Sequence, residues 1–183
     1  MCADICIFDR DIDRLRQIDL LYGNRVRTFY SDSLLIEQEI AEADVVIGAV
    51  LLPGAAAPQL VSRNMVKKMK AGAVVVDVAI DQGGCFETSK PTTHADPTFV
   101  LDGVVHYCVA NMPGAVARTS TFALTNATYP FVEALANRGA MKALSIDHHL
   151  RNGLNVHKGV LTSQPVAQAQ KLDFMLAEEF FAA

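Results

Sequence analysis

Two apolar runs limit most strongly what this chain can fold into. Val45–Val50 and Ala73–Val78 are almost entirely apolar on successive residues, so each is expected to be a strand of a sheet that is covered on both faces. Segments of helical periodicity separate them from three further strand-length runs, at 5–8, 26–30 and 104–109. This alternation predicts an α/β fold, a Rossmann-like doubly wound parallel sheet with helices packed on it.

The chain changes character after Thr119. Apolar residues then recur at helical spacing up to Gly139, and the remainder, 140–183, has the pattern of short helices joined by loops. We therefore expect a nucleotide-binding domain over 1–118 and a helical segment over 119–183.

Charge and hydropathy exclude several classes of function. Sixteen basic and twenty acidic residues give a net charge of −4, and no dense basic cluster is present that could follow a phosphate backbone, so nucleic acid is not expected as a partner. No apolar run reaches the roughly 18–20 residues of a membrane span, and the first residues lack the pattern of a signal peptide. A cytoplasmic protein without membrane contact is the expectation.

The cysteines and histidines do not predict a metal site. The four cysteines, Cys2, Cys6, Cys85 and Cys108, form no CxxC pair and lie in or beside apolar stretches, which favours buried reduced thiols. His148 and His149 are adjacent, and neighbours on a helix point about 100° apart, so they are expected at the surface rather than around a metal ion.

In a parallel sheet, ligands bind beyond the carboxyl ends of the strands. Asp9 follows the first strand, where a carboxylate could accept hydrogen bonds from the ribose of a dinucleotide, although Asp9 or Asp11 could simply cap the next helix. Asp81 follows the run 73–78 and precedes Gly83-Gly84. A functional carboxylate on a glycine-rich loop is favoured there, with a purely structural carboxylate as the alternative.

Two further strand ends carry small or amide residues. Gly48 and Ala49 could let a flat ring approach the backbone, or could reflect tight packing of helix on sheet. Asn111 and Met112 follow the last strand, where an amide suits a carboxamide ligand such as nicotinamide, or satisfies its own turn. Arg118 and the hydroxyls of 119–121 open the long helix, whose N-terminus could hold an anion or be capped by them.

The longest of these motifs together resemble the alanine dehydrogenase and pyridine nucleotide transhydrogenase family. The resemblance runs from about Ile5 to about Val166, and its motifs are VIGAVLLPG, VDVAIDQGGC, PTTHADP, VANMPG and RTSTFALTNAT. Within that family the chain is most similar to alanine dehydrogenases, which implies reversible oxidation of L-alanine by NAD to pyruvate, ammonium and NADH.

The resemblance also assigns site residues. It implies that Asp81 is the catalytic carboxylate that handles water or ammonia, and that it also lies beside the cofactor. The adenosine part of NAD would be bound by Asp9, Arg14, Ser31, Val50 and Leu51. The nicotinamide and its ribose would be bound by Val78, Asp81, Val109, Asn111 and Met112. No metal ligand is implied.

Departures from the family pattern are equally specific. Members are about twice as long, and the arginine, lysine and histidine that bind and protonate their substrate lie in the half with no counterpart here. The first strand and glycine-rich loop of the sheet are expected to be absent before Ile5, which would leave a slot in the sheet. We therefore expect a fragment that neither binds NAD tightly nor oxidises alanine alone.

Two other functions remain open at this level. One is the nucleotide-binding subunit of an NAD(P) transhydrogenase, and the other is a non-catalytic nucleotide-binding or assembly remnant. The resemblance further implies a homo-oligomer, commonly a hexamer, when the full chain is present.

Overall fold

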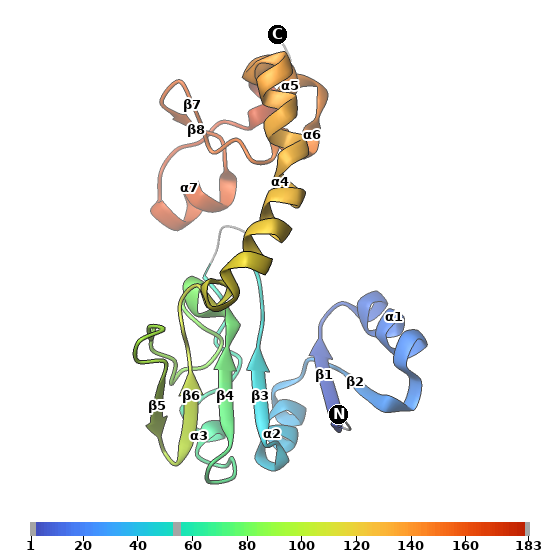
Figure 1. The fold of residues 1–183 in the computed structure, drawn as a ribbon, viewed down its shortest axis with the longest axis vertical. Coiled ribbons are helices and arrows are strands. Elements are labelled where there is room, and N and C mark those ends of the chain that lie inside the picture. The colour runs from blue at the N-terminus through green and yellow to red at the C-terminus, as the bar shows by residue number, and fades with distance from the viewer. Residues whose placement is uncertain (1–2, 53–55, 182–183) are drawn as a thin grey trace. The chain divides into compact units, whose positions relative to one another are not determined.

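The computed structural model describes residues 3–52 and 56–181 and divides the chain into two compact units (Figure 1). Unit 1 comprises 1–51 and 57–110, and unit 2 comprises 52–56 and 111–183. The division predicted between 118 and 119 stays a prediction. Among the described helices, none is long and apolar enough to cross a membrane.

Unit 1 begins with a parallel strand pair joined by a helix. β1 (Ile5–Asp9) pairs with β2 (Val26–Tyr30) in parallel, and α1 (Ile12–Tyr22) connects them. Asp11 caps α1 by accepting a hydrogen bond from the Arg14 N–H at 3.0 Å. The short 3₁₀ turn η1 (Gly23–Arg25) follows α1 and starts with a glycine at φ 54°. Glycine adopts this backbone conformation readily, so Gly23 ends α1.

A four-stranded sheet forms the rest of unit 1. The strands of this sheet are β3 (Val45–Gly48), β4 (Val74–Asp77), β5 (Thr98–Leu101) and β6 (Val104–Tyr107). They are arranged in the order β3-β4-β6-β5. β3, β4 and β6 are parallel, as predicted, whereas β5 runs antiparallel to β6. β1 and β3 are not paired with each other, which agrees with the expected slot.

One buried cluster holds unit 1 together. It combines residues of α2 (Ser33–Glu42), α3 (Arg63–Val66) and the sheet. Its members include Ile36, Ile40, Val66, Val75, Phe86 and Val104. Helix α3 is short and the chain turns after Val66, yet Met69 still reaches the core at 7% exposure.

Unit 2 is mainly helical. The 3₁₀ turn η3 (Met112–Val116) leads into α4 (Ala117–Arg138), which contains Pro130. Gly139 caps the end of α4, where the sequence predicted that the helix ends. It is followed by short elements: α5 (Ala140–Ile146), α6 (His148–Arg151), the hairpin β7 (Val156–His157) and β8 (Val160–Leu161), α7 (Gln164–Gln170) and η4 (Ala177–Phe180). None of the α4 side chains is buried.

The cysteines and the histidine pair lie largely as expected. Cys85 and Cys108 are buried free thiols, Cys6 is a half-buried one, and Cys2 lies outside the described residues. Burial raises the pKa of the Cys85 and Cys108 thiols. His148 and His149 are exposed.

His106 is a fully buried, neutral histidine that should make stability depend on pH. Its Nε2 lies 2.8 Å from the Thr88 hydroxyl, and its Nδ1 donates to the Val104 carbonyl at 3.0 Å. Burial lowers the pKa of His106 below its usual 6.5. The unfolded chain therefore binds a proton before the folded chain does, so stability present above about pH 6.5 is lost as the pH falls towards the folded pKa.

His106→Gln should remove that dependence. We expect the free energy of unfolding of the unmodified chain to decrease between pH 7.5 and 5.5, and that of the variant to change less. Urea unfolding at both pH values measures the two slopes. Equal slopes would show that His106 does not titrate in this way.

Candidate functional site

The loop after β4 is built around a buried carboxylate. Asp77, the last residue of β4, is 0% exposed. Its Oδ1 accepts a hydrogen bond from the Ala79 N–H at 3.1 Å, and its Oδ2 accepts from the Cys85 N–H at 2.9 Å and the Ser89 hydroxyl at 2.5 Å. Every donor lies in the following segment, so Asp77 fixes the path of the chain from 78 to 89.

Asp81 stands at the exposed part of this loop. The 3₁₀ turn η2 (Val78–Gln82) carries it and ends at Gly83, in a left-handed conformation with φ 96°. Gly84 follows with φ 83°, and its N–H donates to the Ala79 carbonyl at 3.0 Å. The predicted glycine-rich loop therefore presents an exposed carboxylate at the carboxyl end of a central parallel strand, where ligands bind in such sheets.

A second segment clamps the same loop. The Ala57 N–H donates to the Gln82 carbonyl at 2.8 Å, and the Leu60 N–H donates to the Cys85 carbonyl at 2.8 Å. Val61 forms a parallel bridge with Phe86, and both side chains are buried. The loop is thus held from inside by Asp77 and from outside by 57–61, so its shape is preorganised.

Gly84 is required by this packing, and Gly83 provides a matched control. A Cβ on Gly84 would lie 2.6 Å from Asp77 Oδ2 and 3.0 Å from Ser89 Cβ, whereas a Cβ on Gly83 would meet no atom within 4 Å. Both positions have positive φ. Gly83→Ala should cost about 1 kcal/mol, and Gly84→Ala about 2–4 kcal/mol because overpacking adds to the backbone cost. Urea unfolding measures both, and equal costs would contradict the packing argument.

Asp9 lies at the carboxyl end of β1, beside the end of β2. Its carbonyl accepts from the Ser31 N–H at 2.9 Å, and its Oδ1 accepts from the Asp11 N–H at 2.9 Å. Asp11 is the residue that caps α1, so of the two capping candidates the sequence left open, Asp11 has that role. Asp9 and Ser31 are therefore neighbours at one strand end, and Arg14 lies exposed in the first turns of α1 with its Nη1 3.2 Å from Gln17 Oε1.

The remaining predicted cofactor residues of unit 1 differ in exposure. Leu51 and Val78 are 68% and 49% exposed, Val50 is half-buried and packs against the core, and Val109 is 0% exposed. The Val109 side chain therefore cannot touch a ligand without a rearrangement. Gly48 is explained by packing, because a Cβ there would lie 2.6 Å from the Phe86 ring.

Asn111 and Met112 belong to unit 2. Asn111 has φ 56° and ψ 52°, a left-handed conformation that asparagine tolerates better than most residues, and precedes η3. Met112 is half-buried. The two units are described separately, so the predicted grouping of these two residues with Asp81 stays a prediction.

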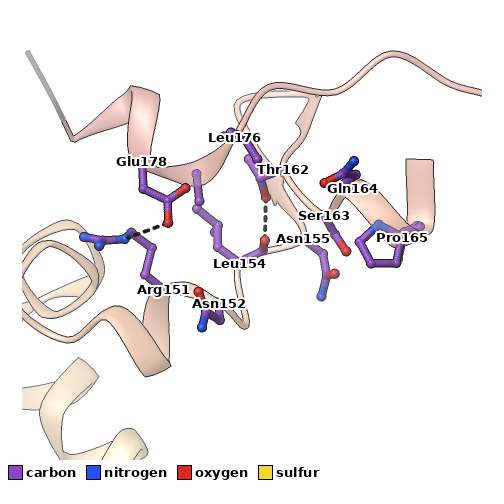
Figure 2. A pocket seen from close by; sticks show the side chains of 12 residues that line it. Arg151, Asn152, Leu154, Asn155, Thr162, Ser163, Gln164, Pro165, Leu176 and Glu178 are labelled. Carbon is purple, nitrogen blue, oxygen red and sulfur yellow. Dashed lines mark hydrogen bonds and ion pairs between the residues drawn. The ribbon is translucent and has the colours of Figure 1, made fainter. Parts of the chain in front are cut away.

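A hollow of about 430 Å³ lies in unit 2. Figure 2 shows that the guanidinium of Arg151 points to Glu178 there, with 3.9 Å between Nε and Oε1, and that the Thr162 hydroxyl bonds to the Leu154 carbonyl. Arg151 Nη1 also donates to the Leu144 carbonyl at 3.3 Å. Arg151 and Thr162 thus interact with neighbouring groups of the same unit, which indicates a structural role for these two side chains. Among the described residues, no group of three or more histidines, cysteines or acids could hold a metal ion.

Asp77 is the residue that the sequence reasoning missed. It is an acid directly after Ala73–Val76, and a charged residue at the end of a buried strand needs several hydrogen-bond donors. That signal was available without the structure.

Comparison with known proteins gives consistent matches. A family model described as alanine dehydrogenase/PNT, C-terminal domain, matches residues 1–164. The alanine dehydrogenase of Halomonas elongata is 60% identical over 175 residues, which are 96% of this chain and 47% of that protein. The alanine dehydrogenase of Mycolicibacterium smegmatis is 53% identical over 182 residues, 100% of this chain and 49% of that protein.

Solved structures agree. An L-alanine dehydrogenase structure matches with a TM-score of 0.81 and 51% identity, over 92% of this chain and 46% of that chain. A transhydrogenase from Sinorhizobium meliloti matches with a TM-score of 0.68 at 24% identity, over 88% of this chain and 43% of that chain, which shows a shared fold. This chain spans about half the length of the relatives that it matches.

Proposed function

Because this chain belongs to the alanine dehydrogenase and pyridine nucleotide transhydrogenase family, as its motifs predicted, we propose that it forms the nucleotide side of an NAD-dependent alanine dehydrogenase. The reaction is the oxidation of L-alanine with NAD and water to pyruvate, ammonium and NADH. One observation carries the proposal: Asp81 is exposed at the carboxyl end of β4, on a loop that Asp77 holds in place.

The described residues fit a dinucleotide at two strand ends. At the ends of β1 and β2, the Asp9 carboxylate accepts a hydrogen bond from the Asp11 N–H through Oδ1. A carboxylate has several acceptor sites, so Asp9 can also accept from ribose hydroxyls. Arg14, Ser31, Val50 and Leu51 would complete the adenosine side. Val78 and Asp81 would hold the nicotinamide side. When bound, NAD supplies the acceptor for the hydride that leaves the alanine Cα.

Asp81 acts as the proton-handling carboxylate in this proposal. An exposed carboxylate on a fixed loop can accept a proton from water as it adds to the imine carbon, and return it as ammonia leaves. Val78, 49% exposed at the start of the same turn, offers an apolar surface to a ring.

The chain needs further polypeptide to complete the reaction. It spans about half of its relatives, and by resemblance the residues that bind the substrate belong to the other half. We expect the 183 residues alone neither to bind NAD tightly nor to form NADH from alanine. The whole enzyme is further proposed to be a cytoplasmic homo-oligomer, a hexamer by resemblance.

Fusion to a relative's missing part tests the proposal. The part of the Halomonas elongata alanine dehydrogenase that the match does not cover is joined in front of Met1, and NADH absorbance is followed with alanine and NAD. We expect NADH formation by the fusion and none by the chain alone. A fusion that folds but moves hydride only between two nicotinamide nucleotides would favour the transhydrogenase alternative. Binding of NAD without any turnover would favour a non-catalytic module.

A further inference from the structure

Arg10 is an unpaired arginine at the carboxyl end of β1. It is exposed and stands directly after Asp9, the last residue of that strand. Among residues 3–52 and 56–181, its guanidinium has no hydrogen bond, ion pair or ring contact. The other arginines of unit 1 share one feature, a partner for the guanidinium within the same unit. They are Arg14, Arg16, Arg25, Arg27 and Arg63. Arg10 is therefore available to a ligand at this strand end.

A tight turn holds Arg10 beside the Asp9 carboxylate. Asp9 Oδ1 accepts a hydrogen bond from the Asp11 N–H at 2.9 Å, and this bond spans Arg10, where the chain bends. Asp11 then caps α1 by accepting from the Arg14 N–H, so the helix fixes the turn from its other side. The long side chain of an arginine in the middle of such a turn can reach a group that binds next to the carboxylate.

Asp9 and Arg10 favour different forms of the adenosine ribose. A carboxylate at this strand end accepts hydrogen bonds from the ribose 2′-hydroxyl of NAD, whereas a nearby arginine accommodates the 2′-phosphate of NADP. Arginine binds phosphate through charge-assisted hydrogen bonds, often two in parallel. Because both groups stand at the same strand end, we do not expect this site to reject a 2′-phosphate strictly.

The other acids near the two strand ends already have partners. Asp11 caps α1 and Asp32 caps α2, each by accepting hydrogen bonds from backbone N–H groups. Their negative charges are partly balanced by the positive ends of the two helices. Asp9 is thus the main group that would repel a 2′-phosphate, and Arg10 is the group that would offset this repulsion.

We propose that Arg10 is a specificity-determining residue that binds a 2′-phosphate on the adenosine ribose, so that the enzyme accepts NADP as well as NAD. The ligand class is an adenine nucleotide that is phosphorylated at the 2′ position. Asp9 still favours the free 2′-hydroxyl, so NAD remains the better substrate. The role of Arg10 rests on the proposed function, which puts the adenosine of the cofactor at the ends of β1 and β2.

Binding of two adenosine fragments tests this role without turnover. The fusion to the Halomonas elongata part is titrated by calorimetry with adenosine 2′,5′-bisphosphate and with adenosine 5′-monophosphate, which differ only in the 2′-phosphate. We expect Arg10→Leu to weaken binding of the bisphosphate about 10- to 100-fold, the usual effect of hydrogen bonds to a charged group. Binding of the monophosphate should change by less than about twofold.

A conservative variant adds a second measurement. Arg10→Lys keeps the charge but loses the paired N–H donors, so its affinity for the bisphosphate should lie between those of the unmodified fusion and Arg10→Leu. Retained binding of the monophosphate shows that each variant is folded at this site. Unchanged affinity of Arg10→Leu for the bisphosphate would overturn the proposal.

Arg25→Leu is the matched control. Arg25 is also exposed, but it lies in η1, directly before the amino end of β2 and therefore at the opposite end of the parallel pair from Asp9. Its replacement removes the same charge away from the proposed ribose site, so both fragments should bind as they do to the unmodified fusion. Equal weakening by Arg10→Leu and Arg25→Leu would indicate a general effect of charge and would overturn the local role of Arg10.

Kinetics separate this proposal from the proposed function. With alanine as substrate, we expect the unmodified fusion to reduce NADP as well as NAD, and Arg10→Leu to lower the ratio of kcat/KM for NADP to that for NAD about 10- to 100-fold. Reduction of NAD without any reduction of NADP would overturn the role of Arg10 alone. Binding of the bisphosphate that depends on Arg10, with no turnover of either nucleotide, would overturn the proposed function alone.

Discussion

Asp81→Asn is expected to lower the turnover of alanine by the fused enzyme by about 10²- to 10⁴-fold, the usual contribution of a group that transfers protons. The amide has the shape of the carboxylate but cannot accept a proton at neutral pH. The loop should keep its fold, because its hydrogen bonds converge on Asp77 rather than on Asp81. Initial rates of NADH formation at saturating alanine and NAD measure the effect.

Asp19→Asn is the control for this variant. Asp19 is an exposed carboxylate on α1, so its replacement removes the same charge away from the strand ends. Its turnover should match that of the unmodified fusion. An Asp81→Asn enzyme that keeps more than about a tenth of the activity would contradict the proton-transfer role.

Asp77→Ala is expected to cause the largest loss of stability, about 3–5 kcal/mol, because three donors would lose their acceptor and each unsatisfied buried group costs about 1–3 kcal/mol. The substitution would leave the Ala79 and Cys85 N–H groups and the Ser89 hydroxyl without their acceptor, at a position with 0% exposure. Such donors cannot reach water while the loop keeps its fold. Urea unfolding of the 183-residue chain measures the change.

Asp77→Asn separates the hydrogen bonds from the volume of the side chain. Asparagine keeps one acceptor oxygen but places an NH₂ group against the remaining donors. Asp77→Asn should lower the free energy of unfolding, but by less than Asp77→Ala does. A loss below about 1 kcal/mol for Asp77→Ala would show that the loop does not depend on the buried carboxylate.

The parallel core of the fold was predictable because its strands are runs of successive apolar residues. The expectation that both sheet faces are covered was wrong for β3, where Val45 and Ile47 are 55% and 63% exposed. Runs such as Val45–Val50 have few alternatives once their length excludes a membrane span. The hairpin of β5 and β6 was not predicted, although Asp102-Gly103 lies between two apolar runs and has φ values of 52° and 81°. An Asp-Gly pair in such a position is a hairpin signal, so this strand could have been found from local sequence.

The sequence indicated which residues could belong to the site, but not which side chains pack around them. Asp81 could be selected because an acid beside two glycines at a strand end is unusual, and the structure places it on an exposed turn. The burial of Val109 and the packing of Gly48 on Phe86 depend on contacts between distant segments. These are tertiary contacts, which local sequence patterns do not predict.

Formation of NADH from alanine and NAD tests the central claim most directly. The chain is assayed alone, fused to the uncovered part of the Halomonas elongata enzyme, and as the Asp81→Asn fusion. We expect activity in the unmodified fusion, none in the chain alone and about 10²- to 10⁴-fold less in the variant. A folded fusion without alanine-dependent NADH formation would contradict the claim that this chain supplies the nucleotide side of an alanine dehydrogenase.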